Sequence, residues 1–221
     1  MVGGSGGSGL AGSGASGAAR GAAGSLGVPL PREFYRRDPR DVAPALLHKV
    51  LVHRGRSGRI VEVEAYCGGI DPGSHTYRGM TERNRTMFGP PGGLYVYFTY
   101  GMHWCANAVC GERGVGVAVL LRALAPLTGL DEMRAARPRA RRDRDLCSGP
   151  AKLCQALGLD RTFDGADLVT GDRSVTIVDD GTPPPARPVQ TTRIGLRNGA
   201  EHPWRWYVEG DPNVSRPAGR P

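Results

Sequence analysis

The sequence predicts an α+β fold, in which a mostly antiparallel, curved β-sheet is flanked by helices in a single compact domain. Runs of β-branched and aromatic residues follow one another at short spacing, and two other segments combine an early proline with a helical pattern. The length of 221 residues is enough to bury a sizeable core without disulfides or a metal. These observations favour one domain of ordinary size.

The two ends of the chain differ in composition from the rest. Residues 1–27 are almost entirely Gly, Ser and Ala, so they have little to bury and we expect a disordered tail. From Pro31 onward the composition becomes that of a globular protein. We predict a folded domain over residues 28–216 and a short C-terminal tail over residues 217–221.

The first half of the domain is predicted to contain one helix and most of the sheet. The helix is expected over residues 41–50, "DVAPALLHKV", with Asp41 as its cap and an early proline. A strand follows over residues 61–66. Three further strand-like runs come next, at residues 94–100, 105–110 and 116–124. Together these runs predict a mostly antiparallel sheet.

The second half is predicted to contain two helical segments. Residues 130–144 begin as a helix, but Pro138 interrupts it and arginines crowd its latter part. Residues 148–159 form another helix, with Ser148 as its cap and Gly158 near its end. Two strand-like stretches, "SVTIV" and "WRWYVEG", close the domain.

The chain is basic. Its formal net charge is +8, and the first 31 residues contribute only Arg20, so the excess belongs to the folded part. Such an excess favours phosphate-rich or other anionic partners, through electrostatic attraction and counterion release.

The cysteines and the apolar segments indicate the compartment. The five cysteines form no CxxC pair and their number is odd, which argues against both a disulfide framework and a zinc knuckle. No apolar stretch approaches the ~18 residues of a membrane helix, and the N-terminus lacks a signal-peptide pattern. We therefore expect a cytoplasmic protein that is neither secreted nor bound to a membrane.

The strand in "RIVEVEAYCGG", residues 59–69, has two unlike faces. Alternation places Glu62, Glu64 and Tyr66 together on one of them. The other face is apolar and is predicted to join the core, with Val61, Val63, Ala65 and Cys67. For an isolated strand, a solvated polar face is the ordinary interpretation. However, Arg122 lies inside the apolar run "AVLLRAL" and needs a carboxylate partner, for which Glu62 and Glu64 are candidates.

An aromatic strand and a long polar loop supply further candidate residues. Tyr95 and Tyr97 share one face of "LYVYFTYGMHW". Aromatic residues in strands more often belong to a core, but beside a basic surface they also suit the stacking of nucleic-acid bases, worth ~1–3 kcal/mol each. In the loop, Arg83 and Arg85 have a spacing suited to successive phosphates or to pairing with acids. His75, as a lone histidine, also has an ordinary structural interpretation.

Several motifs occur in a characteristic order: "RIVEVEAY", "SHTYRG", "RNRTMF", "LYVYFTYGMHWCAN", "VLLRALAP", "SGPAKLCQALGL" and "RIGLRNGAEHPWRWYVEGDPNVS". In this order they resemble the alkyladenine (3-methyladenine or alkylpurine) DNA glycosylase family, over roughly Phe34 to Ser215. The resemblance implies a base-excision repair enzyme that acts on double-stranded DNA containing damaged purines. It also implies that the damaged base is flipped out and released by water, without metal or cofactor, and that an abasic site remains.

The resemblance assigns three residues to the chemical step. Glu64 is the general base that activates water for attack on the anomeric carbon, and its charge favours an oxocarbenium-like transition state. Arg122 matches the arginine that helps to hold this water, and the backbone carbonyl of Ile194 matches the other water acceptor. Glu62 receives no catalytic role, and we expect it to pair with an arginine.

Other residues are assigned to the damaged base and to the duplex. Tyr66, His75 and Tyr97 match residues that line the damage pocket and stack on the extruded base. Asn107 matches an asparagine that opposes normal guanine by a clash with its exocyclic amine. Tyr100 matches the wedge that enters the duplex where the base has left. The remaining residues assigned to DNA binding are Arg83, Arg85 and Lys152.

Two alternatives stay open from the sequence. One is a non-catalytic nucleic-acid-binding module that uses the same tyrosines and basic surface. The other is a sugar glycosidase that uses Glu62 and Glu64, although alternation places them only ~7 Å apart on one strand instead of on opposite sides of a substrate.

We expect a monomer in the cytoplasm, associated with the nucleoid if the source is bacterial.

Deleting residues 1–27 should leave the melting temperature and the turnover nearly unchanged, because this segment has almost nothing to bury. Thermal denaturation and a base-release assay on the shortened protein measure the two quantities. A large loss of either would show that the segment is part of the working enzyme.

Overall fold

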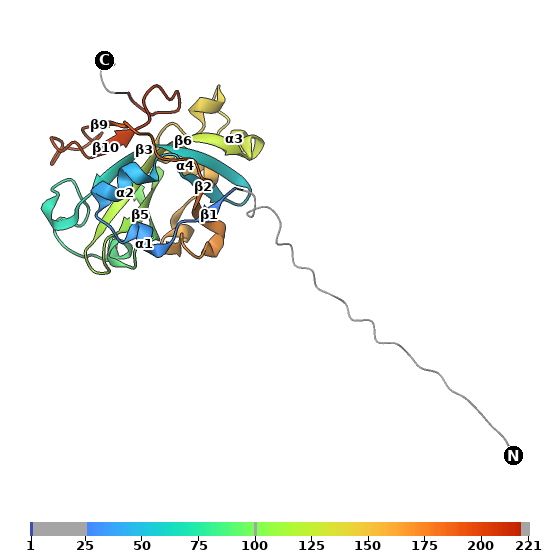
Figure 1. Ribbon diagram of the computed structural model, residues 1–221, viewed down its shortest axis with the longest axis horizontal. Coiled ribbons are helices and arrows are strands. Elements are labelled where there is room, and N and C mark those ends of the chain that lie inside the picture. The colour runs from blue at the N-terminus through green and yellow to red at the C-terminus, as the bar shows by residue number, and fades with distance from the viewer. Residues whose placement is uncertain (2–25, 100, 218–221) are drawn as a thin grey trace.

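The computed structural model describes Met1 and residues 26–99 and 101–217 (Figure 1). Most of the two predicted tails, and Tyr100, lie outside these residues.

The described residues form a curled antiparallel sheet, which confirms the predicted fold class (Figure 1). Its strands are β1 Val28–Pro29, β2 Val50–His53, β3 Arg56–Tyr66, β4 Gly93–Thr99, β5 His103–Cys110, β6 Val117–Thr128, β7 Ala166–Asp167, β8 Val175–Asp179, β9 Val189–Thr191 and β10 Arg205–Tyr207. The strand order is β1-β8-β2-β3-β6-β5-β4-β7, and β10 pairs with both β3 and β9. Strands β3 and β6 are longer than predicted and form the most extensive pair.

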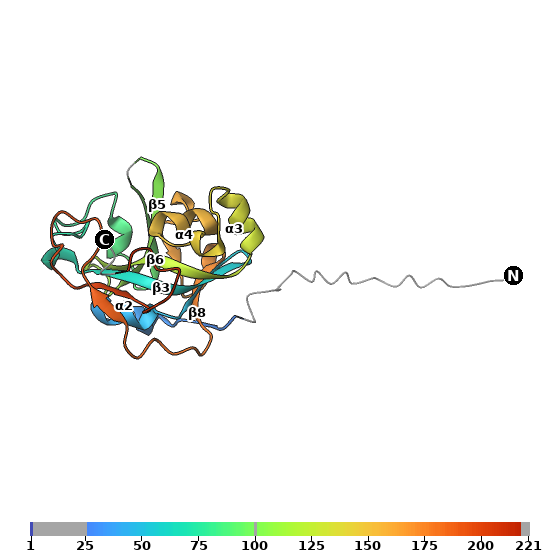
Figure 2. The same cartoon turned by 90° about the horizontal axis from the view of Figure 1, so that it is seen from above.

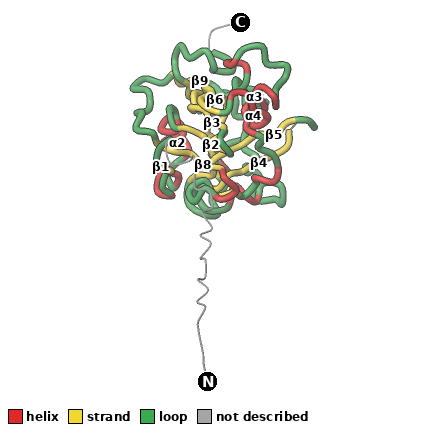
Figure 3. The backbone as a smooth tube through the Cα atoms, turned by 90° about the vertical axis from the view of Figure 1, so that its right-hand side faces the viewer, coloured by secondary structure: helices red, strands yellow, loops and turns green. Residues whose placement is uncertain are grey.

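Helices flank both sides of this sheet. The α-helices are α1 Arg32–Tyr35, α2 Pro39–Leu46, α3 Leu130–Ala136 and α4 Pro150–Leu157. Short 3-10 helices are η2 Gly68–Ile70, η3 Arg85–Phe88, η4 Asp143–Asp145, η5 Arg161–Phe163 and η6 Asp172–Ser174. Helix α2 lies on one side of β3 and β6, and α3 and α4 lie on the other (Figure 2), so that strands occupy the middle of the molecule (Figure 3). None of the helices in the described part of the chain is long and apolar enough to cross a membrane.

The main core joins one face of the sheet to the helices. Val63 of β3 and Leu121 of β6 lie in the same buried cluster as Leu46 of α2 and as Leu153 and Leu157 of α4. All five side chains are fully buried. Burial of side chains of this size stabilises the fold by about 1.5–3 kcal/mol each, relative to leaving them exposed.

Helix α2 begins earlier than predicted, and its cap is a different aspartate. Asp38 accepts a hydrogen bond from the backbone N–H of Arg40 at 2.8 Å, and Pro39 occupies the first helical position. Asp41 therefore lies inside the first turn and is not the cap. The physical reason is that proline, which lacks an N–H, is best placed at the first position, where no hydrogen bond is lost.

Helix α4 also departs from its predicted start. Gly149 precedes Pro150 as the capping residue, and the Ser148 hydroxyl accepts a hydrogen bond from Lys152 Nζ at 3.2 Å instead of capping the helix. The predicted end is confirmed, because Gly158 ends the helix in the left-handed conformation with φ of 71°.

A bulge in β3 changes which side chains share a face. Ile60 lies opposite Leu124 on β6. Glu62 lies opposite Ala123, so Val61 is an extra residue in β3. Ile60 packs in the main core, whereas Val61 packs in a separate cluster with Ala123. Val61 is buried in a hydrophobic core, as predicted, but it does not share the face of Val63 and Ala65, because a bulge interrupts the alternation on which that prediction rests.

A second bulge in β6 compensates for the first. Leu121 lies opposite Val63, while Ala123 lies opposite Glu62. Arg122 is therefore an extra residue in β6, and it lies with Ala123 on the side away from the main core. This places the Arg122 guanidinium next to the Glu62 carboxylate, at 2.8 Å.

A row of opposed residues crosses five strands on this second face. Tyr95 of β4 lies opposite Asn107 of β5, which lies opposite Leu120 of β6. Leu120 in turn lies opposite Glu64 of β3, and Glu64 lies opposite Arg205 of β10. Directly opposed residues of antiparallel strands point to the same face. Strand pairing thus gathers polar residues that are far apart in the sequence.

His53, at the end of β2, is a titratable side chain enclosed by the fold. It is 1% exposed, and its ring meets Phe163 edge to face with the ring centroids 4.6 Å apart. Burial, together with the charges of Arg54 and Arg56, lowers the pKa of His53 to about 4. The folded protein therefore keeps this imidazole neutral at pH values where an unfolded chain protonates it.

Acid should weaken the fold through His53. The unfolded state binds more protons between the ordinary pKa of 6.5 and the folded value, so stability falls as the pH drops through this range. Between about pH 6.5 and about pH 4.5 we expect the native protein to lose about 2 kcal/mol more free energy of unfolding than His53→Leu. Urea unfolding at both pH values measures the difference, and equal losses in the two proteins would contradict the assignment.

Candidate active site

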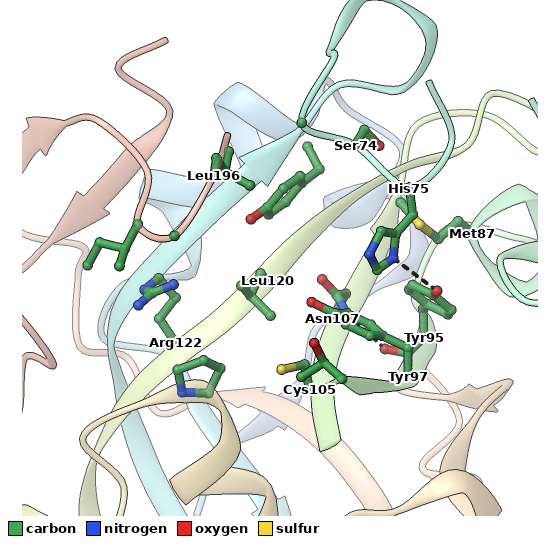
Figure 4. A pocket seen from close by; sticks show the side chains of 16 residues that line it. Ser74, His75, Met87, Tyr95, Tyr97, Cys105, Asn107, Leu120, Arg122 and Leu196 are labelled. Carbon is green, nitrogen blue, oxygen red and sulfur yellow. Dashed lines mark hydrogen bonds between the residues drawn. The ribbon is translucent and has the colours of Figure 1, made fainter. Parts of the chain in front are cut away.

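A cavity of about 320 Å³ lies on the face of the sheet that carries the row of polar residues. In Figure 4, His75, Tyr95 and Tyr97 gather on one side and Arg122 lies on the other, with Leu120 between them. The lining residues are Tyr66, Gly73, Ser74, His75, Met87, Tyr95, Tyr97, Thr99, Cys105, Asn107, Leu120, Arg122, Pro150, Ile194, Gly195 and Leu196. A concave site with apolar walls and a few convergent polar groups suits a small, flat ligand.

The aromatic side of the cavity is held together by ring contacts. The Tyr95 and Tyr97 rings stack with centroids 5.4 Å apart and an interplanar angle of 26°. His75 meets Tyr97 edge to face at 4.5 Å, and its Nδ1 lies 3.3 Å from the Tyr95 hydroxyl, within hydrogen-bond reach. Asn107 donates from Nδ2 to the Tyr95 carbonyl at 3.1 Å. These contacts fix the wall before any ligand binds.

This wall is uncharged near neutral pH. Burial, with the nearby charge of Arg83, lowers the pKa of His75, so its imidazole is neutral. Burial raises the pKa of Tyr97, and burial with the charge of Glu64 raises that of Tyr66. The cavity therefore offers neutral ring faces for stacking.

Glu64 lies beneath the cavity, with no exposed surface. Its Oε1 accepts a hydrogen bond from the backbone N–H of Ile194 at 2.8 Å and lies 3.1 Å from Arg122 Nη1. Its Oε2 accepts a hydrogen bond from the Tyr66 hydroxyl at 2.9 Å. All three partners line the cavity, although the Glu64 side chain itself does not. The carboxylate is thus anchored directly below the wall groups.

Glu62 is also fully buried, and its carboxylate accepts more hydrogen bonds than that of Glu64. It accepts hydrogen bonds from the Nε atoms of Arg122 and Arg205, both at 2.8 Å, and from the backbone N–H and hydroxyl of Ser215 at 2.7 and 2.9 Å. Burial alone raises the pKa of Glu62, but the two guanidinium groups reverse this and lower it. The predicted pairing of Glu62 with arginine is confirmed, and the solvated-face interpretation is wrong.

The two carboxylates in turn act on the arginine between them. Burial works to lower the pKa of Arg122, but the charges of Glu64 and Glu62 raise it.

No group of three or more His, Cys, Asp or Glu side chains in the described part of the chain is arranged to hold a metal ion.

Most of the predicted site residues come together at this cavity. Those that line it are Tyr66, His75, Tyr97, Asn107, Arg122 and Ile194. Glu64 contacts three of them from below. Tyr100 lies outside the described residues.

The three basic residues assigned to DNA lie outside the cavity. Arg83 is exposed and donates to the Phe98 carbonyl at 3.0 Å, beside the hairpin between β4 and β5. Arg85 is exposed and pairs with Glu82 at 3.3 Å. Lys152 lines a separate polar cavity of about 680 Å³ next to the N-terminus of α4. These three side chains can therefore contact a ligand only outside the aromatic cavity.

Two residues next to the site were missed by the sequence analysis. Asp71 and Arg193 form an ion pair with no exposed side-chain surface, directly behind Tyr66 and Ile194. Neither residue belongs to an alternating or helical pattern, and 122 positions separate them in the chain. Arg193 opens the motif "RIGLRNGAEHPWRWYVEGDPNVS", but this motif does not indicate its partner, and an aspartate within a long loop is too common to do so.

Comparison with known proteins was consistent over nearly the whole described chain. Residues 33–212 match the family model described as methylpurine-DNA glycosylase. A protein of Burkholderia lata with the provisional name 3-methyladenine DNA glycosylase is 60% identical over 195 residues, which is 88% of this chain and 94% of the relative.

Relatives from distant organisms carry the same provisional name. One from Streptomyces avermitilis is 49% identical over 193 residues, covering 85% of this chain and 91% of the relative. Another from Methanoculleus marisnigri is 49% identical over 197 residues, covering 85% of this chain and 98% of the relative. With a family match over most of its length and relatives at this identity, the chain belongs to the methylpurine-DNA glycosylase family.

Proposed function

We propose that this protein is a monofunctional DNA glycosylase of base-excision repair. It flips alkylated or deaminated purines out of double-stranded DNA, hydrolyses the N-glycosidic bond with an activated water, and leaves an abasic site. One observation carries this proposal: the Glu64 carboxylate is anchored beneath an aromatic cavity by Arg122, the Ile194 N–H and the Tyr66 hydroxyl.

The cavity is proposed to take the extruded purine. A base inside a duplex cannot reach a buried carboxylate, so it must leave the stack at a cost of a few kcal/mol. Stacking on Tyr66 and Tyr97, with His75 at the edge, offsets part of this cost, because base–aromatic stacking contributes ~1–3 kcal/mol per base. The wedge role of Tyr100 belongs to the same proposal.

Asn107 is proposed to exclude normal guanine. Its amide is fixed by the hydrogen bond to the Tyr95 carbonyl, and the side chain is buried between strands β4 and β6. A fixed group cannot move away from an exocyclic amine, so a base that carries one there is rejected by a clash. Guanine carries its exocyclic amine at C2, where adenine derivatives carry none, so adenine derivatives avoid the clash.

The chemical step is proposed to use the remaining hydrogen-bonding capacity of Glu64. Its Oε2 accepts one hydrogen bond, from Tyr66, and a carboxylate oxygen can accept two. A water held there, with the Ile194 carbonyl as its second acceptor and Arg122 nearby, attacks the anomeric carbon as the bond to the purine breaks. The purine takes the bonding electron pair, and Glu64 accepts the water's proton. Its negative charge also stabilises the oxocarbenium character of the sugar.

The lysine content supports a hydrolytic, monofunctional enzyme. Strand cleavage by a glycosylase through a Schiff base requires an amine at the anomeric carbon. The chain contains two lysines, Lys49 and Lys152, and neither lines the aromatic cavity. Lys49 pairs with Asp179 at 2.7 Å. Water is therefore the proposed nucleophile.

The substitution Glu64→Gln tests the function. In single-turnover assays on duplex DNA with one ethenoadenine or hypoxanthine, we expect it to slow base release by ~10²–10⁴-fold, because the amide cannot accept the water's proton. Lesion binding should persist, and alkali should be needed to cut the strand at the abasic site.

Glu33→Gln is the matched control, since Glu33 is exposed, pairs with Arg36 at 3.6 Å and does not line the cavity. Its rate should equal that of the native protein. Tight duplex binding by the native protein without any base release would contradict the proposal, and would favour a nucleic-acid-binding module.

The charge of the leaving base should set the pH dependence. Methylation on a ring nitrogen makes the purine cationic, so it leaves readily, whereas neutral hypoxanthine or ethenoadenine requires protonation as it departs. Release of the neutral bases should be slower and should fall more steeply as the pH rises from about 6 to about 8. Rate profiles for 3-methyladenine and hypoxanthine, corrected for spontaneous loss, measure this. Parallel profiles would contradict it.

A further inference from the structure

A buried ion pair lies directly behind the candidate active site. Arg193 Nη1 is 2.6 Å from Asp71 Oδ2, and Arg193 Nη2 is 2.7 Å from Asp71 Oδ1. Neither side chain has any exposed surface. The geometry is bidentate, in which the planar guanidinium matches the carboxylate with two parallel bonds. Such a pair is strongly directional and holds both partners in one orientation.

The same two side chains bind the backbone of three segments. Arg193 donates to the carbonyl of Ala65, near the end of β3, at 3.0 Å and to the carbonyl of Gly199 at 2.9 Å. Asp71 accepts from the backbone N–H of Cys67 at 3.0 Å and from that of Gly73 at 2.9 Å. The pair therefore connects the end of β3, the loop that leads to His75, and the segment that contains Ile194.

The backbone around the pair is closely packed. A Cβ atom at Gly73 would lie 3.0 Å from Arg193 Nη2, and one at Gly199 would lie 3.1 Å from it. Gly199 also has φ of 62°, which favours glycine. The guanidinium thus fits a cradle that leaves it little freedom to move.

Arg193 also contacts the aromatic wall from outside the cavity. Its Cζ lies 4.7 Å from the centroid of the Tyr66 ring and 5.0 Å from that of Trp204. Tyr66 lines the cavity and Arg193 does not, so the guanidinium supports the ring from behind. Trp204 is itself stacked on His202, with centroids 4.0 Å apart. The Tyr66 ring is therefore held against a layered stack.

We infer that Arg193, locked by Asp71, is a positioning residue for base excision, which fixes the Tyr66 ring and the Ile194 N–H relative to Glu64. Arg193 precedes Ile194 in the chain, so its anchorage sets where the N–H that binds Glu64 Oε1 lies. This inference rests on the proposed function. It assigns Arg193 no contact with the substrate.

Arg193→Lys tests the inference. Lysine keeps the positive charge beside Asp71 but loses the planar fork and the stacking on Tyr66. Misplacement of about 1 Å can slow a reaction by ~10²-fold. At saturating protein we therefore expect single-turnover release of ethenoadenine to slow at least ~10-fold, with duplex affinity within about threefold of native. The fluorescence change of ethenoadenine on binding, which reports its stacking in the cavity, should shrink.

Arg59→Lys is the matched control. Arg59 lies on β3, and like Arg193 it pairs with an aspartate, Asp180 at 2.7 Å, and donates to a backbone carbonyl, that of His48 at 2.7 Å, but it does not line the cavity. Its release rate and fluorescence change should remain native. Urea unfolding of both variants verifies that each is folded under the assay conditions.

Several outcomes would overturn the inference. These are native rate and fluorescence in folded Arg193→Lys, or equal losses in both lysine variants. If Arg193→Lys does not fold, the double variant Asp71→Asn with Arg193→Gln replaces it, because this variant leaves no unpaired buried charge. It should show the same loss of release rate. Native activity of the double variant, or its failure to fold, overturns the inference. Absence of base release by the native protein contradicts the proposed function instead, so the two failures are distinguishable.

Discussion

The candidate active site depends on one buried guanidinium. Arg122 lies 2.8 Å from Glu62 and 3.1 Å from Glu64, and neither carboxylate has exposed surface. Burying an unpaired charge costs several kcal/mol, and two acids on one strand face would also repel each other. Arg205 supplies a second positive charge from β10. The paired bulges in β3 and β6 bring Arg122 beside both acids, so the site forms only when these strands pair in this register.

The surroundings of the two acids divide their roles. Glu62 accepts four hydrogen bonds, two from arginines and two from Ser215, so its acceptor capacity is used by the fold. Glu64 accepts two hydrogen bonds and one ion contact, and its Oε2 keeps capacity for a further donor. Two carboxylates of identical chemistry are thus separated into a structural anchor and a candidate base by what surrounds them. The same contrast explains why a glycosidase with two acting carboxylates does not fit, since Glu62 is committed to the fold.

The features that sequence could predict are those with a local signal. Alternation in β3 and β4, the glycine that ends α4, and the need of Arg122 for an acidic partner follow from residue type and spacing. The bulge at Val61 could not be predicted, because an extra residue in a strand leaves the sequence pattern unchanged and is fixed by the partner strand. The pairing of Arg193 with Asp71 was equally inaccessible, since it depends on how the chain brings distant loops together. The candidate site residues were predicted from shared motifs, whereas the residues that contact them from behind became visible only in the fold.

The composition of the basic surface also bears on the chemistry. Lysine accounts for only two of the 29 basic residues, so nearly all of the positive charge is carried by arginine. Guanidinium groups bind phosphates and carboxylates in a planar, bidentate manner and stay protonated, which makes them poor nucleophiles. Lysine amines, in contrast, become nucleophilic when their pKa falls on burial. Arginine can thus supply electrostatic attraction for an anionic partner, while neither lysine lines the aromatic cavity. The arginine-rich composition is therefore consistent with the proposed use of water as the nucleophile.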